Sequence, residues 1–431
     1  MRSPSPARTS RLKIYARQAV QARHDDAVGP GILGARNSTL RPSIALVHDW
    51  LDAPGGGEAV LASLLRIFPA APVYTLVDFL SAEERARLGT TDIHTTALQR
   101  IPGAQQWFRY AAALVPELIE RLDTSRYDVV VSDSHAIAKG IRKRPGQVHI
   151  CYCHTPARFA WTMAATYGER AAGRSRLRTA IARRAQARFR AWDLAASRTV
   201  DHFIANSRHI AQMIERCYGR DATVIYPPVD IDRFRAASYA ARAGYVTVSR
   251  LVPYKRIDVI IAAFAQMPSR TLTIVGDGPE RRRLMRDTPA NVTFAGRLDD
   301  RATAEIIGRA RGFLTAAYED FGIATVEAQA AGTPVIAFRE GGASETIRDV
   351  DTTEPTGVLF DEQTPAAIIN AIERFESMSI DADACRRNAA RFSEARFRSE
   401  FMEHFDVLIG DMHSDEDVHR TAQQQRSRAD A

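Results

Sequence analysis

The sequence predicts an α/β protein made of two doubly wound domains, each a parallel sheet covered by helices on both faces. Two observations carry this prediction. From residue 44 onward, apolar runs of strand length alternate with helical stretches, which is the pattern of buried parallel strands. The alternation breaks at Tyr226-Pro-Pro-Val-Asp230 and starts again after Gly244, so we expect one domain on each side of this break.

The order of elements follows from these runs. The expected strands lie at 44–51, 73–78, 127–134, 148–154, 202–207 and 223–228, then at 245–249, 272–278, 292–296, 312–317, 334–338 and 356–360. Helical stretches separate them, for example Glu58–Ile67 and Gln105–Leu122.

We expect the two domains to span residues 41–236 and 237–395. Residues 1–40 are expected to form a flexible extension, and residues 412–431 a disordered tail. Between the second domain and the tail, a helix at 396–411 is expected to pack back on the first domain.

The composition is that of a folded globular protein, with 45% hydrophobic and 25% charged residues among 431. The net charge is +7, but residues 1–40 contribute +5, so the body is almost neutral and nucleic-acid binding loses most of its electrostatic support. The extension can also be read as a transit peptide, because it is rich in arginine and poor in acids.

The cysteine pattern and the length of the apolar runs indicate in which cellular compartment the protein is expected. The four cysteines form no CxxC pair, so neither a zinc site nor a disulfide framework is indicated, and a reducing cytoplasm is the expected location. No apolar run reaches the ~18 residues that a membrane span needs.

One block of the first domain is locally basic. Residues 170–190 contain eight arginines and no acid, and Leu177, Ile181, Ala185 and Phe189 recur at steps of four. One interpretation is a helix with a solvated charged face. The other is a surface that attracts anionic lipid or an acceptor that carries a pyrophosphate.

The most informative motif follows the expected strand 312–317. Glu319 lies on a loop, and Glu327 lies about one turn inside the helix that follows. The backbone N–H groups of residues 321–324 form the start of this helix and favour a phosphate. Two carboxylates beside an anion site suit a nucleotide-sugar, with sugar hydroxyls on one side and ribose hydroxyls on the other. The alternative is a surface glutamate and a helix-stabilising glutamate.

Three further motifs lie where expected strands end. Arg250 and Lys255 can neutralise a diphosphate, although they can also be surface charges. Gly276 and Gly278 allow a base or ribose to come close to the backbone. In the first domain, the glycines at 55–57 precede a helix and allow close approach of a phosphate or sugar, without forming a Walker loop or a GxGxxG motif. His154 ends a strand and is expected to point toward the ligand, although a lone histidine is more often structural.

As a set, these motifs resemble the retaining glycosyltransferases of family 4, which have the GT-B fold of two Rossmann-like domains facing a central cleft. The resemblance covers residues 42–405 and rests on EDFGIATVE, SRLVPYK, VGDGP, ANS and IYPPVD. Within that family, HDWL with GGGE, SDSHAIAKG and YCHTPARFAW are most similar to the mannosyltransferases of O-antigen and exopolysaccharide assembly. Such enzymes use GDP-mannose and an acceptor linked to polyprenyl diphosphate.

The resemblance implies a role for each matching position. On the donor side, Glu319 would bind the sugar hydroxyls, His154 would lie near the sugar O6, and Phe321, Gly322 and Ile323 would lie near the sugar and phosphate. Arg250 and Lys255 would bind the diphosphate, and Glu327 would bind the ribose. Gly276 and Gly278 would lie along the nucleotide, and Gly56 and Gly57 would close over the donor. On the acceptor side they are His135, Lys139 and Arg158. Asp320 departs from the family, which usually has glycine there, and this bears on the choice of hexose.

The resemblance also implies a mechanism: retention by same-face attack, with the leaving phosphate accepting the acceptor proton. Asp230-Ile-Asp232 has DxD spacing but follows the Pro-Pro linker, so we expect catalysis without a metal or other cofactor. The expected location is the inner face of the cytoplasmic membrane, without a span. The alternatives are a UDP-sugar donor, a nucleotide-sugar epimerase, a nicotinamide oxidoreductase, for which the fingerprint is missing, and a non-catalytic subunit of a polysaccharide-assembly complex.

Overall fold

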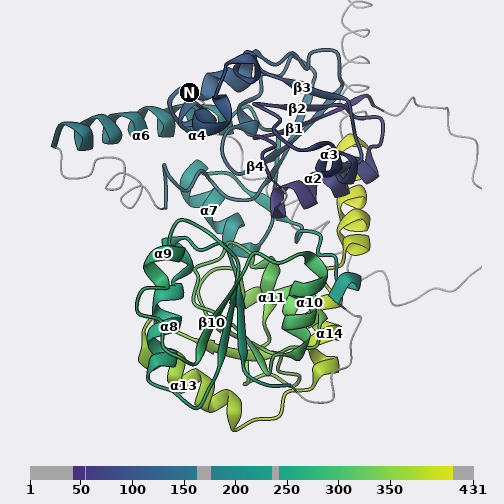
Figure 1. Ribbon diagram of the computed structural model, residues 1–431. Helices are drawn as coiled ribbons and strands as arrows, with labels where there is room; N and C mark the ends of the chain where they lie inside the picture. The colour runs from purple at the N-terminus through teal and green to yellow at the C-terminus, as the bar shows by residue number, and fades with distance from the viewer. Residues whose placement is uncertain (1–41, 54, 163–175, 235–241, 411–431) are drawn as a thin grey trace, which may run out of the picture. The chain divides into compact units, whose positions relative to one another are not determined.

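The computed structural model describes residues 42–53, 55–162, 176–234 and 242–410. The predicted extension at 1–40, the tail at 412–431 and the first part of the arginine block lie outside these residues. From Pro42 onward the chain forms two parallel sheets, each with its own helices (Figure 1). We call the sheet of residues 42–228 with its helices the first lobe, and that of residues 229–393 the second lobe.

The first lobe contains a seven-stranded parallel sheet in the order β3-β2-β1-β4-β5-β6-β7. Its strands are β1 (Ile44–His48), β2 (Val73–Thr75), β3 (Ile93–Thr95), β4 (Val129–Ser134), β5 (Val148–Cys153), β6 (His202–Ala205) and β7 (Ala222–Val224). The strands β1, β4 and β5 are buried almost throughout, which explains their continuous apolar runs. The order reverses between β1 and β4, where ligands bind in open α/β sheets.

The second lobe contains a six-stranded parallel sheet in the order β10-β9-β8-β11-β12-β13, which reverses between β8 and β11. Its strands are β8 (Tyr245–Val248), β9 (Leu272–Val275), β10 (Val292–Gly296), β11 (Gly312–Thr315), β12 (Val335–Phe338) and β13 (Gly357–Phe360). The two Rossmann-like sheets confirm the predicted α/β fold class, and every predicted strand segment overlaps a strand. The short edge strand β3 was not predicted, because Ile93-His-Thr95 is half-buried and lacks an apolar run.

Helices connect the strands of both sheets. In the first lobe these are α2 (Gly56–Ile67), α3 (Ala82–Leu88), η1 (Ala97–Arg100), α4 (Ala104–Leu114), η2 (Pro116–Arg121), η3 (Ala138–Gly140), α6 (Arg176–Ser197) and α7 (Arg208–Tyr218). In the second they are η4 (Asp232–Phe234), η5 (Pro253–Lys255), α8 (Ile257–Ala265), α9 (Arg281–Leu284), α10 (Asp300–Arg309), α11 (Ile323–Ala330), α12 (Ala343–Thr346), α13 (Pro365–Glu376) and α14 (Ala382–Ala390).

The expectation of one helix from Gln105 to Leu122 was wrong. The helix α4 ends at Leu114, Val115 leaves the helical region with φ −135° and ψ 63°, and the 3₁₀ helix η2 begins at Pro116. Proline lacks the N–H that would continue the helix, and its ring disfavours a helical conformation at the preceding residue.

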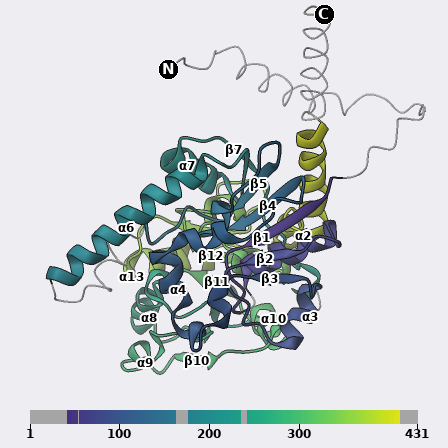
Figure 2. The same ribbon diagram turned by 90° about the horizontal axis from the view of Figure 1, so that it is seen from above.

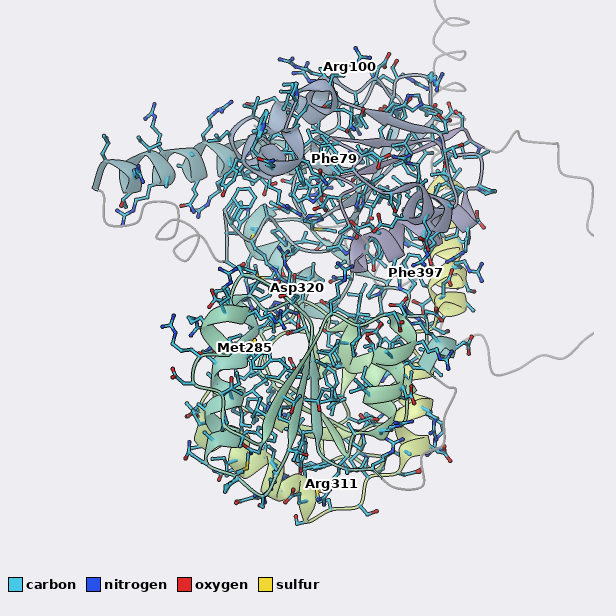
Figure 3. The ribbon with its side chains drawn as sticks, viewed as in Figure 1. Phe79, Arg100, Met285, Arg311, Asp320 and Phe397 are labelled. Carbon is cyan, nitrogen blue, oxygen red and sulfur yellow. The ribbon has the colours of Figure 1, made fainter. Side chains whose placement is uncertain are left out.

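A helix at 394–410 returns from the second lobe to the first. Its side chains Phe397, Phe401, Phe405 and Leu408 belong to the same hydrophobic cluster as Leu46 of β1. Figure 2 shows this yellow helix beside β1 and α2, and Figure 3 labels Phe397 on it. The first lobe therefore completes its core with residues from the last helix that the structure describes.

The helices α4 and α6 carry exposed apolar side chains. Tyr110 and Leu114 on α4 are 72% and 52% exposed, and Leu177 and Ile181 on α6 are 71% and 59% exposed. Both views show α6 projecting from the first lobe (Figures 1 and 2). None of the helices in the described ranges is long and apolar enough to span a membrane.

Candidate functional site

The predicted site residues lie at the carboxyl ends of the central strands of both sheets. In the first lobe they follow β1, β4 and β5, and in the second they follow β8, β9 and β11. These ends flank the point at which each strand order reverses, so parallel topology alone brings the motifs of each lobe together.

In the second lobe, Lys255 and Glu319 are in direct contact. The Lys255 ammonium donates to Glu319 Oε1, and both side chains are less than one-fifth exposed. Arg250 is exposed and has no ion-pair partner among the described residues, although its charge acts on Asp52 of the first lobe. Burial raises the pKa of Asp52, while Arg109 and Arg250 oppose this shift. Lys255, predicted to bind the diphosphate, and Glu319, predicted to bind the sugar, therefore share one location, whereas Arg250 acts on the first lobe.

Two glycines that the sequence reasoning missed hold the Glu319 loop in position. The Gly342 N–H donates to the Glu319 carbonyl at 2.8 Å. A Cβ on Gly341 would lie 2.2 Å from that carbonyl oxygen, and one on Gly342 would lie 2.3 Å from the Phe321 Cα. The signal was available as a Gly-Gly pair two residues after β12, since glycine permits a close backbone approach.

The reason for glycine at 276 and 278 differs from the expected approach of a base or ribose. A Cβ on Gly276 would lie 1.9 Å from the Ser249 carbonyl oxygen, and one on Gly278 would lie 2.4 Å from the Leu251 carbonyl oxygen. Gly276 also has φ of 131°, which disfavours a side chain. These glycines let the turn after β9 pack against the segment that carries Arg250.

The start of α11 is built as expected from its sequence, except at Phe321. Gly322 has a left-handed conformation with φ of 90° and precedes the first turn, so backbone N–H groups are presented at Ile323 and beyond. The Phe321 side chain is 3% exposed and packs with Tyr226 and Phe392. Only its backbone is available to a ligand, so its side chain does not approach the sugar as predicted.

Glu327 is held by a residue that the sequence reasoning did not single out. Arg233 in η4 donates to Glu327 at 2.8 Å and pairs with Asp300 at 2.9 Å. Burial raises the pKa of Glu327, against the opposing effect of Arg233. The Glu327 carboxylate, which was predicted to bind the ribose, is therefore paired with Arg233.

The glycine loop of the first lobe lies against the start of α11. A Cβ on Gly56 would lie 2.7 Å from Ile323 Cδ1, so the absence of a side chain permits this contact. A Cβ on Gly57 would lie 3.4 Å from His48 Cε1 and 3.8 Å from His154 Nε2. Residues from both lobes thus meet at the loop, and the roles of Gly56, Gly57 and His154 toward a donor stay predictions.

A buried cluster of histidines and carboxylates lies beneath this loop. Asp133 accepts from His48 Nδ1 at 2.9 Å and from His154 Nε2 at 2.5 Å. Burial alone would lower the pKa of His48, but its hydrogen bond to Asp133 and the charges of Asp133 and Glu58 raise it to about 10. The 3.7 Å from His48 Nε2 to Glu58 is too long for a hydrogen bond, so Glu58 acts through its charge.

Asp49 organises the turn that carries His135. Its carboxylate accepts the four backbone N–H groups of residues 135–138 and the His135 ring at 2.8 Å. Burial alone would raise the pKa of Asp49, but the charge and hydrogen bond of His135 hold it well below its usual range. The sequence contained a signal for Asp49, His48 and Asp133, since all three stand where strands beside the reversal point end.

Two of the residues predicted for the acceptor side are engaged elsewhere. Lys139 is completely buried and pairs with Asp193 at 2.5 Å, so its charge does not face an acceptor. The reason is that Asp193 on α6 neutralises an ammonium that water cannot reach. Arg158 donates to Asp320 of the second lobe through Nε and Nη2, at 3.0 and 2.5 Å. Of the three residues, His135 alone has neither a buried charge nor a partner in the other lobe.

Asp320 joins the lobes through its backbone as well. Its carbonyl accepts from Ser207 Oγ at 2.7 Å, and Figure 3 labels it where the loop after β11 meets the first lobe. Burial alone would lower the pKa of Arg158, but the charge of Asp320 raises it above its usual range. Among the described residues, no group of three or more His, Cys, Asp and Glu side chains has the arrangement of a metal site.

Two protein-family models match the chain in succession. The model described as Glycosyltransferase Family 4 matches residues 54–233, and the model described as Glycosyl transferases group 1 matches residues 229–392. The second match begins at Val229, whose side chain belongs to the hydrophobic cluster of the second lobe.

The curated relatives are similar over part of their length. The chain is 27% identical over 250 residues to the D-inositol 3-phosphate glycosyltransferase of Nocardia farcinica, covering 49% of this chain and 54% of that protein. It is 31% identical over 182 residues to D-inositol 3-phosphate glycosyltransferase 2 of Catenulispora acidiphila, covering 35% and 42%. The chain thus spans about half the length of the curated relatives it matches.

The solved structures are similar over almost their whole length. Anabaena Alr3699/HepE in complex with UDP and glucose aligns with a TM-score of 0.60 at 21% identity, covering 85% of this chain and 100% of that one. A glycosyltransferase from Rickettsia africae aligns with a TM-score of 0.56 at 16% identity, covering 86% and 99%. At these identities the likeness establishes the fold. Residues 54–392 of this chain therefore belong to the glycosyltransferases that the two family models describe, and they are built on the GT-B fold.

Proposed function

We propose that this protein is a retaining hexosyltransferase that takes its sugar from a nucleoside-diphosphate donor. The observation that carries the proposal is the Lys255–Glu319 contact beside the start of α11, where the Gly56 loop of the first lobe reaches Ile323. The exposed Arg250 adds a second cation just after β8. Cations, helix N–H groups and a carboxylate at one location suit a sugar joined to a diphosphate.

The proposed chemistry depends on stabilising the leaving group. Negative charge grows on the diphosphate as the bond to the anomeric carbon breaks, and Arg250, Lys255 and the start of α11 would stabilise that charge. The Lys255 ammonium would then exchange its contact with Glu319 for the donor, which frees the carboxylate for sugar hydroxyls. His154 would contact the sugar, and the leaving phosphate would take the proton of the acceptor hydroxyl.

The donor is proposed to be GDP-mannose, from the resemblance of the first-lobe motifs to mannosyltransferases. A UDP-sugar is the second candidate, because Alr3699/HepE was solved with UDP-glucose and aligns with a TM-score of 0.61. Thermal shifts with GDP-mannose, UDP-glucose, UDP-galactose and UDP-GlcNAc decide between them, since a bound donor stabilises the native protein. Stabilisation by UDP-sugars alone would contradict GDP-mannose.

Substitutions at the site test the proposed activity itself. Arg250→Ala and Lys255→Ala are each expected to lower the rate of sugar transfer by at least ~10²-fold, because each removes charge stabilisation of the leaving group. Arg282→Ala on α9 is the matched control, because Arg282 is an exposed arginine of the same lobe outside the site. Normal transfer by both site variants would refute the assignment.

The two glutamates are proposed to serve opposite ends of the donor. Glu327→Ala is expected to weaken binding of the free nucleoside diphosphate by about tenfold, through loss of a ribose contact. Glu319→Ala is expected to lower kcat while leaving that affinity nearly unchanged. Isothermal titration with the nucleoside diphosphate and steady-state kinetics measure both, and equal losses of affinity would contradict the division.

We further propose that the acceptor is a saccharide linked to polyprenyl diphosphate, and that the protein works at the anionic inner face of the cytoplasmic membrane. The exposed Leu177 and Ile181 beside the exposed Arg183 and Arg184 on α6 support this, because apolar and basic side chains on one helix suit a lipid interface. Arg188 does not belong to this surface set, since it donates to the Leu114 carbonyl and thereby joins α6 to α4.

Vesicle flotation tests the membrane surface. Binding to phosphatidylcholine vesicles that contain phosphatidylglycerol is expected at low salt, and it should weaken as salt screens the arginines. Replacing Arg183 and Arg184 with Gln should reduce binding, whereas a chain without residues 1–41 should still bind. Binding that is lost with residues 1–41 and unaffected by the two substitutions would assign the anchor to the extension.

A further inference from the structure

One buried carboxylate holds two histidine rings at the candidate site. Asp133 is at the end of β4, beside His48 at the end of β1, and the parallel register pairs these two residues. One carboxylate oxygen accepts from His48 and the other from His154, so both are engaged. Asp133 and His48 are buried, while the His154 side chain is 14% exposed.

The geometry singles out one nitrogen of His154. Because Nε2 is bound to Asp133, the ring can offer a ligand only Nδ1, which has no hydrogen-bond partner among the described residues. The ring lies beneath Gly57, where a Cβ would be 3.8 Å from Nε2. A side chain that is bound on one edge and partly exposed on the other suits contact with a ligand at the glycine loop.

We propose that Asp133 is a positioning residue for the proposed sugar transfer: by holding His154 through Nε2, it presents Nδ1 to the donor sugar. His48 supports this role because it binds the second oxygen of Asp133 and so prevents the carboxylate from turning. This inference rests on the proposed function, since it assigns an orientation to the histidine that would contact the donor. Partners of this kind fix the orientation of functional histidines elsewhere in proteins.

The charges around His154 agree with this role. Burial alone would lower the pKa of His154, but the charge and hydrogen bond of Asp133 raise it. The other groups that face it are His48 from β1, whose charge lowers this pKa, Asp49 after β1, whose charge raises it, and the His135 and Tyr152 rings at 6.5 and 5.3 Å. With Nε2–H donating to an ionised Asp133, protonation of His154 makes Nδ1 a hydrogen-bond donor.

The first test does not depend on activity. In the full-length protein labelled with ¹³C at histidine Cε1, the His154 signal, assigned with His154→Gln, is expected to titrate above 6.5 and to move to lower pH in Asp133→Asn. Asp193→Asn is the matched control, because it neutralises another buried carboxylate of the same lobe, the one that is paired with Lys139. It should lower stability while leaving the His154 titration unchanged. An unchanged titration in Asp133→Asn would overturn the proposal.

The second test is kinetic. Asp133→Asn is expected to lower kcat by at least ~10-fold with little change in donor affinity, and to shift the pH profile of kcat. The double variant Asp133→Asn/His154→Gln should be no slower than His154→Gln alone, because Asp133 acts through His154. Losses that multiply in the double variant would overturn the proposal. A wild-type protein that transfers sugar from no donor would instead refute the proposed function, while the NMR titration would still decide the role of Asp133.

Discussion

The ion pair between Arg158 and Asp320 allows a quantitative test of how the lobes are held together. The Arg158 side chain is 24% exposed and that of Asp320 is 12% exposed, so both charges have lost most of their water. Arg158 also lies over the Tyr254 ring, at 5.4 Å from its centroid. Removing one partner leaves the other charge poorly solvated, which is the costly way to break such a pair.

The magnitude lies between two limits. Breaking a fully buried pair costs about 3–5 kcal/mol, whereas an exposed pair contributes about 0–1 kcal/mol. With this partial exposure, Arg158→Met and Asp320→Ala are each expected to lower the free energy of unfolding by about 2–3 kcal/mol. The double variant removes both charges and is expected to lose only about 3 kcal/mol, so the coupling energy should be about 2 kcal/mol.

Equilibrium urea unfolding of the four proteins in this cycle measures the coupling. Ser207 still donates to the backbone carbonyl of residue 320 in every variant, so the comparison isolates the side chains. The control is the exposed pair Glu83–Arg87 on α3, for which the same cycle should give ~0.3–0.5 kcal/mol. A coupling for Arg158 and Asp320 no larger than that of the control would refute the argument that burial makes this pair strong.

Three further predictions concern stability. Gly276→Ala is expected to lower the free energy of unfolding by more than ~3 kcal/mol, because its Cβ would lie 1.9 Å from a carbonyl oxygen. Gly89→Ala, at positive φ with no atom near its Cβ, should lower it by only ~1 kcal/mol, and thermal unfolding measures both. The stability that His48 contributes should be complete below pH 6.5 and lost as pH rises toward 10, so His48→Gln should flatten this alkaline decline in unfolding measured across pH. Glu345→Ala should cost about 1–2 kcal/mol by urea unfolding, because Glu345 accepts two backbone N–H groups at the start of α7, and a loss below ~0.3 kcal/mol would contradict a capping role.

The sheets could be predicted because buried parallel strands leave a continuous apolar record in the sequence. That record is local, so it located β1 and β11 but could not reveal β3, which is short, half-buried and at an edge. Pro116 was a visible signal against one long helix, and the apolar spacing from Gln105 to Leu122 outweighed it in the prediction.

The candidate site was predictable only within each lobe. Lys255 and Glu319 could be brought together by reasoning, because both follow strands beside the same reversal point. Arg158 and Asp320 are 162 positions apart and belong to different sheets, so no spacing rule connects them. Lys139 was wrongly assigned to the acceptor side for a related reason. Its buried charge is paired with Asp193 on α6, and no spacing rule connects these two residues.

The helix at 394–410 has a consequence for the order in which the chain folds during synthesis. Every strand of the first sheet has been translated by Val224, yet Phe397 and Phe401, both completely buried, fill part of the same core. The core of the first lobe therefore stays incomplete, with an exposed apolar surface, until the whole second lobe has been synthesised. A fragment that ends at residue 236 should keep that surface exposed and aggregate, and adding residues 394–410 as a separate peptide should restore its solubility.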